Sequence, residues 1–326
     1  MPLTDLPLER LREYHCDVPA PADFATFWEE TLAAARSAAT GPATYRPVTD
    51  SALRTVDVFD VRFPGWDGQA VAGWLILPRG AAPGDALPAV VRYSPYNNGR
   101  GSYLDHLAWP SAGYAHLVVD ARGMGDATPD PDPAPGPQSP RGFMTRGIAD
   151  RDQYVYRRLV TDAVRALDAV RDHPVVDPAR VVVSGRSQGG GLALATAGLV
   201  GGDAAAALVD VPFLCHFRRG AQIASQGPYT DFTAYLGERQ LADPERTFAT
   251  LDYFDGVHFA PRATAPALFS VALMDPVCPP STVYAAYHRY AGEREMEVWP
   301  FGDHAGGRTA QLAKQLAWVA ERGITP

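Results

Sequence analysis

The sequence predicts an α/β protein with a mainly parallel central sheet, helices on both faces and an antiparallel hairpin at its entry edge. Short apolar runs alternate with helical segments along most of the chain, which is the pattern of a parallel sheet. Two strand-like segments flank an Asp67-Gly68 turn, which predicts the hairpin. A chain of 326 residues can bury the core of such a fold, so we assign residues 1–326 to a single domain.

The expected elements follow in chain order. An amphipathic helix is expected over 22–39, within an N-terminal helical extension of residues 1–45, because Phe24, Trp28 and Leu32 recur at helical spacing. The hairpin strands are expected at 56–63 and 70–78. Further strands are expected at 88–93, 115–120, 180–184, 206–211, 267–272 and 297–299. Further helices are expected at 154–173, 188–200, 281–290 and 309–322.

The segment 126–150 is predicted to be a surface loop, because residues 126–140 are dense in proline and aspartate. Proline lacks the backbone N–H that helices and strand ladders need. The loop follows a strand end, where α/β sheets place their ligands. It is therefore either the rim of a site or an ordinary surface excursion.

Composition limits the possible partners. The formal net charge of −8, without a clustered basic stretch, argues against nucleic acid and against anionic membrane surfaces. Cys16, Cys215 and Cys278 are far apart and form neither a metal-spaced pair nor a disulfide framework, so we interpret them as small buried residues. The N-terminus lacks a basic region followed by an apolar run, and no apolar stretch approaches the length of a membrane span. These observations predict a cytoplasmic protein.

The segment Gly185-Arg186-Ser187-Gln188-Gly189 is the most informative part of the chain. It follows the β-branched run 181–183 and opens the small-residue helix expected at 188–200. A strand, a G-x-S-x-G turn and a helix in this order are typical of a nucleophile elbow, which exposes the serine hydroxyl at the sheet edge. Glycines flank the serine because a side chain there would collide with the strand or the helix. Ser187 is therefore the predicted nucleophile; the alternative is a glycine-rich turn whose serine only caps the helix.

A serine hydroxyl becomes a nucleophile when a base removes its proton and an acid orients that base. On this fold the chain order is Ser, then Asp or Glu, then His. The histidines after Ser187 are His216, His258, His288 and His304. His304, in the loop before the C-terminal helix, is the predicted base; the alternative is a solvated loop histidine. Asp275, at the tip of the preceding strand, is the predicted acid rather than a turn or cap residue, and Asp210 is the runner-up.

Two backbone N–H groups are expected to stabilise the negative charge of a tetrahedral intermediate. One belongs to Gln188, the residue after the nucleophile. The other is expected in the loop after strand 88–93, where Pro95 has no N–H and Tyr96 is the best donor. The ring of Tyr96 would also form a wall for the acyl group. Tyr96, Pro228 and Tyr229 are the candidate substrate contacts.

Several blocks of the sequence carry a resemblance to a known family. They are spread over nearly the whole chain and include Asp120-Ala121-Arg122-Gly123, Thr145-Arg146-Gly147-Ile148, Gly185-Arg186-Ser187-Gln188-Gly189-Gly190 and, as the most specific, Met274-Asp275-Pro276-Val277-Cys278-Pro279-Pro280. With these blocks the chain resembles the acetyl xylan esterase and cephalosporin C deacetylase family, carbohydrate esterase family 7.

The resemblance implies an α/β-hydrolase fold and a catalytic triad of Ser187, Asp275 and His304. It implies an oxyanion hole formed by the amides of Tyr96 and Gln188, with no metal or other cofactor. The implied reaction is deacetylation of small acetylated sugars or cephalosporins. The resemblance also implies a homo-oligomer, a hexameric ring whose active sites face an inner cavity that limits substrate size.

Three positions depart from the family pattern: Ser94 stands where the family has histidine, Met124 where it has glutamine, and Ala305 where it has glutamate. None of them belongs to the triad, so we expect hydrolysis to be retained. A polar contact near the base loop is expected to be lost at Met124 and Ala305, which predicts a more apolar pocket mouth. An ester of a more hydrophobic metabolite then becomes an alternative to a sugar ester.

Three hypotheses about function follow. The first is a serine esterase that releases acetate from a small-molecule ester through an acyl-enzyme. The second is an acyltransferase or an acetate-eliminating enzyme of small-molecule biosynthesis that uses the same three residues with water excluded. The third is a non-catalytic family member retained as a binding or assembly module. Every residue type that the triad requires is present, which argues against the third hypothesis.

Overall fold

One mixed sheet runs through the molecule, which is described by a computed structural model of residues 3, 5–131, 142–238 and 243–326. Within these residues the strand order is β1-β2-β3-β5-β4-β6-β7-β8-β9. The pairs β1–β2, β2–β3 and β3–β5 are antiparallel, and the pairs from β5–β4 to β8–β9 are parallel. The strands are β1 (Thr44–Pro47), β2 (Val56–Pro64), β3 (Ala70–Pro78), β4 (Leu87–Tyr93), β5 (Ala115–Val119), β6 (Val176–Arg186), β7 (Ala206–Asp210), β8 (Ala267–Ala272) and β9 (Arg294–Trp299).

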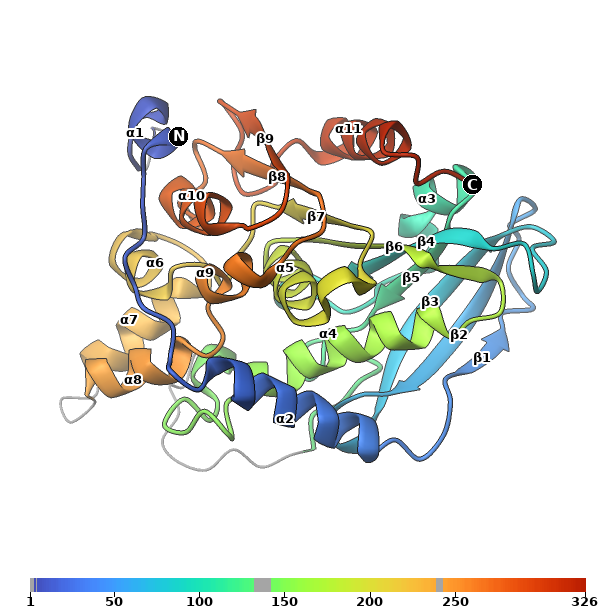
Figure 1. Cartoon of the computed structure of the whole chain (residues 1–326), viewed down its shortest axis with the longest axis horizontal. Helices are drawn as coiled ribbons and strands as arrows, with labels where there is room; N and C mark the ends of the chain where they lie inside the picture. The colour runs from blue at the N-terminus through green and yellow to red at the C-terminus, as the bar shows by residue number, and fades with distance from the viewer. Residues whose placement is uncertain (1–2, 4, 132–141, 239–242) are drawn as a thin grey trace.

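Helices cover both faces of the sheet (Figure 1): α4 and α5 lie on one face, and α3 and α11 lie on the other. This arrangement confirms the predicted fold class, including the antiparallel hairpin at the edge. No helix in the described part of the chain is both long and apolar enough to cross a membrane. The helices are α1 (Leu8–Arg12), α2 (Phe24–Ser37), α3 (Ala108–Ser111), α4 (Val155–Arg171), α5 (Gln188–Val200), α6 (Phe217–Ile223), α7 (Tyr229–Glu238), α8 (Pro244–Leu251), α9 (Gly256–Phe259), α10 (Pro280–Arg289) and α11 (Arg308–Glu321).

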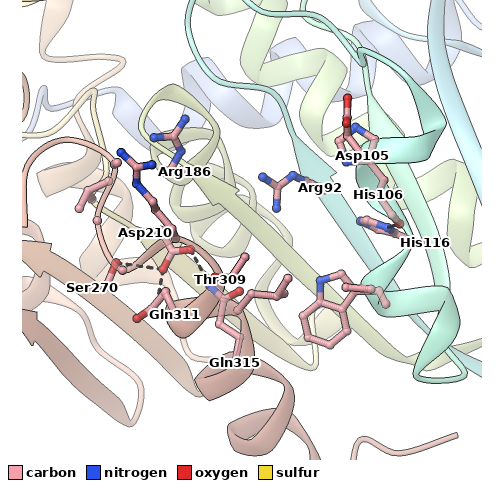
Figure 2. A pocket seen from close by; sticks show the side chains of 18 residues that line it. Arg92, Asp105, His106, His116, Arg186, Asp210, Ser270, Thr309, Gln311 and Gln315 are labelled. Atoms are coloured by element: carbon pink, nitrogen blue, oxygen red, sulfur yellow. Dashed lines mark hydrogen bonds between the residues drawn. The ribbon is translucent and has the colours of Figure 1, made fainter.

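The face under α3 and α11 is only partly filled. Val182 of β6 packs there in a cluster with Trp109 of α3 and Trp318 of α11. Beside this cluster lies a cavity of about 590 Å³, bounded by α11, by the segment 105–109 and by the ends of several strands. Figure 2 shows this cavity with polar side chains around it, among them Arg92, Arg186, Asp210 and His116.

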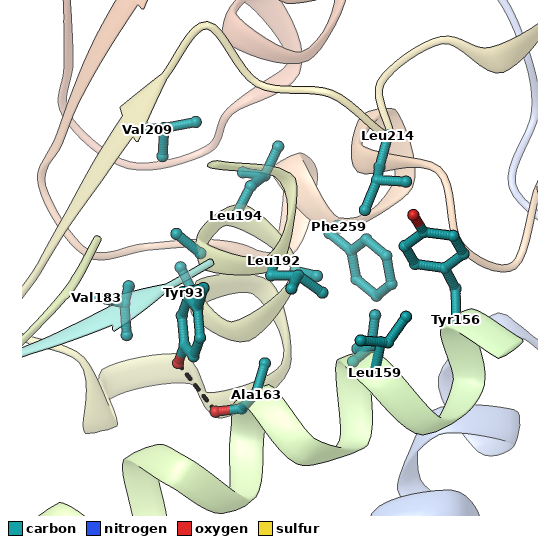
Figure 3. Packing of buried hydrophobic residues seen from close by; sticks show 14 of the residues in the cluster. Tyr93, Tyr156, Leu159, Ala163, Val183, Leu192, Leu194, Val209, Leu214 and Phe259 are labelled. Atoms are coloured by element: carbon teal, nitrogen blue, oxygen red, sulfur yellow. Dashed lines mark hydrogen bonds between the residues drawn. The ribbon is translucent and has the colours of Figure 1, made fainter. Parts of the chain in front are cut away.

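The opposite face, under α4 and α5, is densely packed (Figure 3). Along Val181–Val183 the side chains alternate between the two faces, as successive strand residues do. Leu159 of α4 and Leu192 of α5 are buried in the layer between helices and sheet. The Tyr93 hydroxyl donates to the carbonyl oxygen of Ala163 at 2.9 Å. A strand buried on both faces explains why the sequence before the elbow is an unbroken apolar run.

The predicted elements match the observed ones most closely in the sheet and its long helices. Helix α5 and strand β3 begin and end at the predicted residues. Strand β6 is longer than predicted, and β9 begins at residue 294 rather than 297. Strand β1 and helices α3 and α6–α9 were not predicted. The missed helices have 4 to 10 residues, which is at most about three turns and gives a weak periodic signal.

Only part of the segment 126–150 is the surface loop that the sequence predicts, and residues 132–141 lie outside the described residues. Before them, Thr128 is buried and the carboxylate of Asp130 pairs with Arg158 of α4 at 2.7 Å. After them, Met144 is fully buried in the main core. The described parts of the segment contain no strand and only the short 3₁₀ helix Phe143–Thr145. Their anchors depend on tertiary neighbours that composition does not reveal.

Candidate active site

The turn between β6 and α5 holds Ser187 in a strained backbone conformation. Its φ is 58° and its ψ is −122°, a region that residues other than glycine rarely adopt. A Cβ atom on Gly185 would lie 2.1 Å from the backbone of Gly189, and one on Gly189 would lie 2.2 Å from the carbonyl oxygen of Tyr93. Glycine is therefore required at both positions, and the turn has the geometry of a nucleophile elbow.

Ser187, His304 and Asp275 form a chain of hydrogen bonds. The Ser187 Oγ lies 2.9 Å from His304 Nε2, and His304 Nδ1 lies 2.8 Å from Asp275 Oδ2. Asp275 is fully buried, Ser187 is 3% exposed, and the side chain of His304 is 24% exposed. The three residues that the sequence selects as nucleophile, base and acid therefore lie in direct contact, with only the imidazole partly open to solvent.

The loop after β8 fixes the orientation of Asp275. Its Oδ1 accepts hydrogen bonds from the backbone N–H groups of Val277 at 2.8 Å and Cys278 at 2.9 Å, while Oδ2 faces His304. A carboxylate beside Nδ1 favours the tautomer that carries its proton there. The Nε2 lone pair then points to Ser187, whose hydroxyl can donate to it. This is the tautomer that a general base requires.

The loop between β9 and α11 holds the backbone of His304. Arg186, the residue before the nucleophile, donates from Nη1 to the carbonyl oxygen of His304 at 3.2 Å. The backbone N–H of Ala305 donates to Asp303 Oδ1 at 2.9 Å. A Cβ atom on Gly307 would lie 2.1 Å from the ring of Trp299. The elbow thus contacts both parts of His304: Ser187 contacts its side chain, and Arg186 contacts its backbone carbonyl.

Asp210, the runner-up acid, has different partners. Its carboxylate accepts hydrogen bonds from Ser270 Oγ at 3.0 Å, Gln311 Nε2 at 3.0 Å and Gln315 Nε2 at 2.6 Å. No contact between Asp210 and His304 is found among the described residues. The other histidines after Ser187 also lie elsewhere: His216 contacts Tyr14, His288 contacts the carbonyl of Leu11, and His258 is buried with neither ring nitrogen hydrogen-bonded to a described residue.

Two backbone amides near Ser187 are available as donors. Gln188 is the first residue of α5, so its N–H has no acceptor within the helix. Tyr96 lies in the loop after β4, and the described residues provide no acceptor for its N–H. The Gln188 side chain links the two segments, because its Nε2 donates to the carbonyl oxygen of Ser94 at 3.3 Å and its Oε1 accepts from the Tyr156 hydroxyl at 2.7 Å.

Tyr156 and Ser94 are positioning residues that sequence reasoning missed. Tyr156 is fully buried, and burial raises the pKa of its hydroxyl well above the ordinary range, so it remains a donor to Gln188. The Ser94 Oγ donates to the carbonyl oxygen of Val119 at 2.6 Å and so joins the ends of β4 and β5. A tyrosine in the buried first turn of an amphipathic helix was the only sequence signal for the position of Tyr156.

The predicted substrate contacts are only partly retained. Tyr229 is fully buried, and its hydroxyl donates to the Cys215 carbonyl at 2.6 Å and accepts from the Cys215 N–H at 3.0 Å. Pro228 before it is also buried. The prediction is therefore corrected for Tyr229, whose hydroxyl is used within the segment after β7, whereas Pro228 stays a predicted substrate contact. Tyr96 remains a candidate because it is partly exposed, with its ring centroid 6.5 Å from that of Phe143.

A cavity of about 160 Å³ adjoins His304. Its wall combines charged and amide side chains with apolar ones: Arg186, Gln226, Pro276, Val277, Asp303, His304 and Ala305. The surroundings of the imidazole therefore mix polar and apolar side chains, and the expectation of a mouth more apolar than the family's stays a prediction. Met124, where a polar contact was expected to be lost, packs against the main hydrophobic core.

Asp275, Cys278 and His304 are the one group in the described part of the chain whose metal-ligand atoms lie within 4.8 Å of one another. Both oxygens of Asp275 and both ring nitrogens of His304 already make hydrogen bonds. Burial raises the pKa of the Cys278 thiol well above its ordinary value, whereas metal binding needs the thiolate. The arrangement fits proton transfer better than metal binding.

Comparisons with known proteins bear on the family and the fold of the chain. The model of the family described as acetyl xylan esterase (AXE1) matches residues 1–322. A curated relative, the acetyl esterase Axe7A of Xylanibacter ruminicola, is 27% identical over 308 residues, which make up 87% of this chain and 63% of the relative. The chain therefore spans less than two thirds of the length of that relative.

Two solved structures resemble the chain over nearly its whole length. An acetyl xylan esterase from Paenibacillus sp. R4 has a TM-score of 0.91 at 36% identity, covering 97% of this chain and 99% of that one. Acetyl xylan esterase 1 from Thermoanaerobacterium sp. JW/SL YS485 has a TM-score of 0.88 at 30% identity, covering 98% and 99%. These similarities confirm the α/β-hydrolase fold that the sequence implies.

Proposed function

The chain belongs to the acetyl xylan esterase family, and from this premise we propose that it is a serine esterase that removes acetyl groups from a small acetylated sugar through an acyl-enzyme. The family assignment makes the chain an esterase; the catalytic residues and the substrate are our proposal. The observation that carries it is the hydrogen-bonded chain from Ser187 through His304 to Asp275 at a strained elbow.

In the acylation step, Ser187 Oγ attacks the carbonyl carbon of the ester while His304 Nε2 takes its proton. Asp275 stabilises the resulting imidazolium through Nδ1. The carbonyl oxygen becomes negative and accepts hydrogen bonds from the N–H groups of Gln188 and Tyr96. When the intermediate collapses, the bond to the alcohol oxygen breaks and His304 gives its proton to that oxygen. The alcohol leaves, and the acetyl group stays on Ser187.

In the deacylation step, water takes the place of the alcohol. His304 Nε2 removes a proton from the water as its oxygen attacks the acetyl carbon, and the same two amides stabilise the second oxyanion. The bond to Ser187 Oγ breaks, and Oγ regains its proton from His304. Acetate is released, and the three residues return to their starting protonation states.

The exposure of His304 supports hydrolysis over acyl transfer. Its side chain is 24% exposed and adjoins a cavity of about 160 Å³, which gives water a route to the acyl-enzyme. An acyltransferase would need water excluded from this point. We therefore expect free acetate as the main product even when a candidate acceptor alcohol is present. Dominant formation of the acceptor ester would favour the acyltransferase hypothesis instead.

The polar wall beside His304 supports a hydroxylated leaving group. Arg186, Gln226 and Asp303 offer donors and acceptors where a sugar would leave. The half-buried ring of Tyr96 beside Phe143 supports a short acyl group. A substrate panel tests both points: acetylated xylose and a 3′-acetylated cephalosporin should be turned over faster than an acetate ester of a hydrophobic alcohol. Acetate esters should be turned over faster than butyrate esters.

The serine itself is tested by Ser187→Ala, which removes the attacking oxygen. Turnover of p-nitrophenyl acetate should fall by about 10⁴-fold or more. Ser270→Ala is a matched control, because Ser270 is a buried serine that bonds Asp210 rather than His304. Its turnover should stay close to that of the unmodified chain. Unchanged hydrolysis in Ser187→Ala, with the fold intact by circular dichroism, would rule the proposal out.

We also propose that the chain acts in the cytoplasm and assembles as a homohexamer, as the family resemblance implies. Phe301 supports assembly, because this large apolar side chain is 87% exposed in the loop that carries His304. Light scattering coupled to size-exclusion chromatography should give six times the mass of one chain. Phe301→Ser should lower that mass if Phe301 lies in a contact between copies.

A further inference from the structure

The cavity of about 590 Å³ under α11 lies outside the proposed catalytic chain and carries a distinctive set of charges. Its wall holds three arginines and two aspartates: Arg92, Arg186, Arg308, Asp105 and Asp210. Asp105 and Arg308 are exposed, which places them at its mouth. The wall is therefore net positive in a chain whose formal charge is −8. A volume of this size lies in the range of small-molecule sites.

Arg92 forms no ion pair with a described residue of this wall. No carboxylate of the described residues lies within 4.0 Å of its guanidinium, and none of its N–H groups donates to a described residue. Asp210, the aspartate whose charge acts on it, already accepts from Ser270, Gln311 and Gln315. Burial lowers the pKa of Arg92, as expected for a cation held without a partner. A free guanidinium offers paired N–H donors that match a carboxylate.

His116 supplies an acceptor on the same wall. It is 1% exposed, and its Nδ1 lies 3.0 Å from the carbonyl oxygen of His106, so Nδ1 carries the proton and donates. Nε2 is then a lone-pair acceptor, and it is buried without a partner among the described residues. Figure 2 shows the His116 ring beside Arg92, which lies on the neighbouring strand β4. A ligand hydroxyl would satisfy this nitrogen.

We propose that this cavity is a second ligand site that binds a small monoanionic polyhydroxy acid, such as a sugar acid. The carboxylate would pair with Arg92 and Arg186, and a hydroxyl would donate to His116 Nε2. Three arginines against two aspartates leave one net positive charge, which suits a carboxylate better than a doubly charged phosphate. Asp105 and His116 Nε2 can accept hydrogen bonds, so they select hydroxyl groups that a simple carboxylate lacks.

The proposed site shares lining residues with the cavity beside His304. Arg186 lines both this cavity and the one beside His304, and it holds the His304 carbonyl at 3.2 Å. The loop residues from Ala305 to Arg308 also line the cavity. Any effect of the bound acid on turnover rests on the proposed function, whereas binding itself does not.

Isothermal titration calorimetry of the full chain tests the proposal, with glucuronate as the probe. Glucuronate should bind with one site per chain, about tenfold or more tighter than glucose or acetate, because each of these lacks one of the two recognised groups. Inorganic phosphate should bind more weakly than glucuronate. Binding should persist after the nucleophile is blocked with phenylmethylsulfonyl fluoride, which separates this site from the proposed active site.

Two variants locate the site, and a third controls for the loss of a positive charge. Arg92→Met should weaken glucuronate binding by about tenfold or more, and Arg308→Gln, at the exposed mouth, should weaken it severalfold. Arg46→Gln removes an exposed arginine of β1, far along the sheet, and should leave binding unchanged. Arg92→Met should melt no lower than the unmodified chain, because it replaces a buried charge that lacks an ion pair.

The proposal is overturned by any of four results: no heat with glucuronate, loss of binding on blocking the nucleophile, tighter binding of phosphate, or unchanged binding in both Arg92→Met and Arg308→Gln. If Arg92→Met does not fold, Arg308→Gln and the ligand series still decide. Loss of esterase activity in Ser187→Ala with glucuronate binding intact would support both proposals independently.

Discussion

Two neighbouring polar sites at the elbow, the catalytic one and the cavity under α11, use similar side chains in opposite ways. On the Ser187 side, the hydroxyl, both imidazole nitrogens and both oxygens of Asp275 have partners within 2.9 Å. On the α11 side, Arg92 has no ion pair and His116 Nε2 has no partner among the described residues. A fully paired network fixes one geometry, as proton transfer requires. Unpaired buried groups carry a desolvation cost that a bound molecule can offset.

The two neighbouring polar sites differ in their hydrogen bonding rather than in their residue types. Both contain arginine, histidine, serine and aspartate, so residue type alone does not distinguish them. The difference lies in how many of their hydrogen-bonding groups the protein itself satisfies. We interpret the satisfied site as preorganised for a reaction and the unsatisfied site as ready to receive a ligand.

The largest effect should come from a matched pair of aspartates, one on each side. Asp275→Asn should lower turnover of p-nitrophenyl acetate by about 10⁴-fold, because an amide stabilises the wrong tautomer of His304. Asp210→Asn should lower it by less than about tenfold, since Asp210 bonds Ser270 and two glutamines instead. Steady-state kinetics of both variants provides the measurement. Equal losses of turnover in Asp275→Asn and Asp210→Asn would contradict the distinction between the catalytic site and the α11 cavity.

A smaller effect is expected at the positioning residue Tyr156. Tyr156→Phe removes the hydrogen bond to Gln188 Oε1 and so loosens the link between the elbow and the Tyr96 loop. We expect kcat to fall by about tenfold with KM nearly unchanged, because the lost bond orients the oxyanion donors. A rise in KM at constant kcat would show that Tyr156 contacts the substrate instead. Tyr154→Phe is a control, because the Tyr154 hydroxyl bonds only the Met144 carbonyl.

The smallest effect concerns stability and the buried histidines that the reaction does not use. Burial lowers the pKa of His116 to about 3 and those of His216 and His258 to about 4. Between the unfolded pKa of about 6.5 and these values, the unfolded chain binds protons that the folded chain does not. The contribution of these three histidines to the free energy of unfolding should therefore decrease as the pH falls from about 6.5 toward about 4. Asp252 and Asp255, whose pKa values burial raises to about 6 and about 7, act in the opposite direction.

Urea unfolding at pH 7 and pH 5 measures the net difference. His258→Phe removes one of the three histidines, so the free energy of unfolding should fall less, or rise more, from pH 7 to pH 5 than in the unmodified chain. Arg46→Gln, which changes an exposed residue, should leave the difference unchanged. If the free energy of unfolding changes by the same amount between pH 7 and pH 5 in His258→Phe and in the unmodified chain, His258 does not contribute to the pH dependence.

The candidate catalytic residues were predictable from local signals and chain order. The β-branched run before Gly185, the paired glycines and the small-residue helix identify the elbow without any knowledge of the rest of the fold. Chain order then selects Asp275 and His304, and the structure brings both side chains to Ser187. The hairpin and the central strands follow from periodicity, and those elements are long enough to give it.

The remaining features depend on contacts between distant segments. The bonds from Tyr156 through Gln188 to Ser94 join three segments, and neither hydrogen bond has a sequence signature. The unpaired state of Arg92 is a property of its surroundings in the fold. Tyr229 illustrates the opposite error: an aromatic residue near a predicted site is buried in the core, with its hydroxyl fully used.

The most direct test of the central claim is covalent labelling with a fluorophosphonate probe, followed by peptide mass spectrometry. The probe reacts with a serine only where a base activates it. We predict a single adduct on Ser187 in the unmodified chain and almost none in His304→Ala. An adduct on another residue, or hydrolysis of p-nitrophenyl acetate that continues while Ser187 stays unlabelled, would contradict the account.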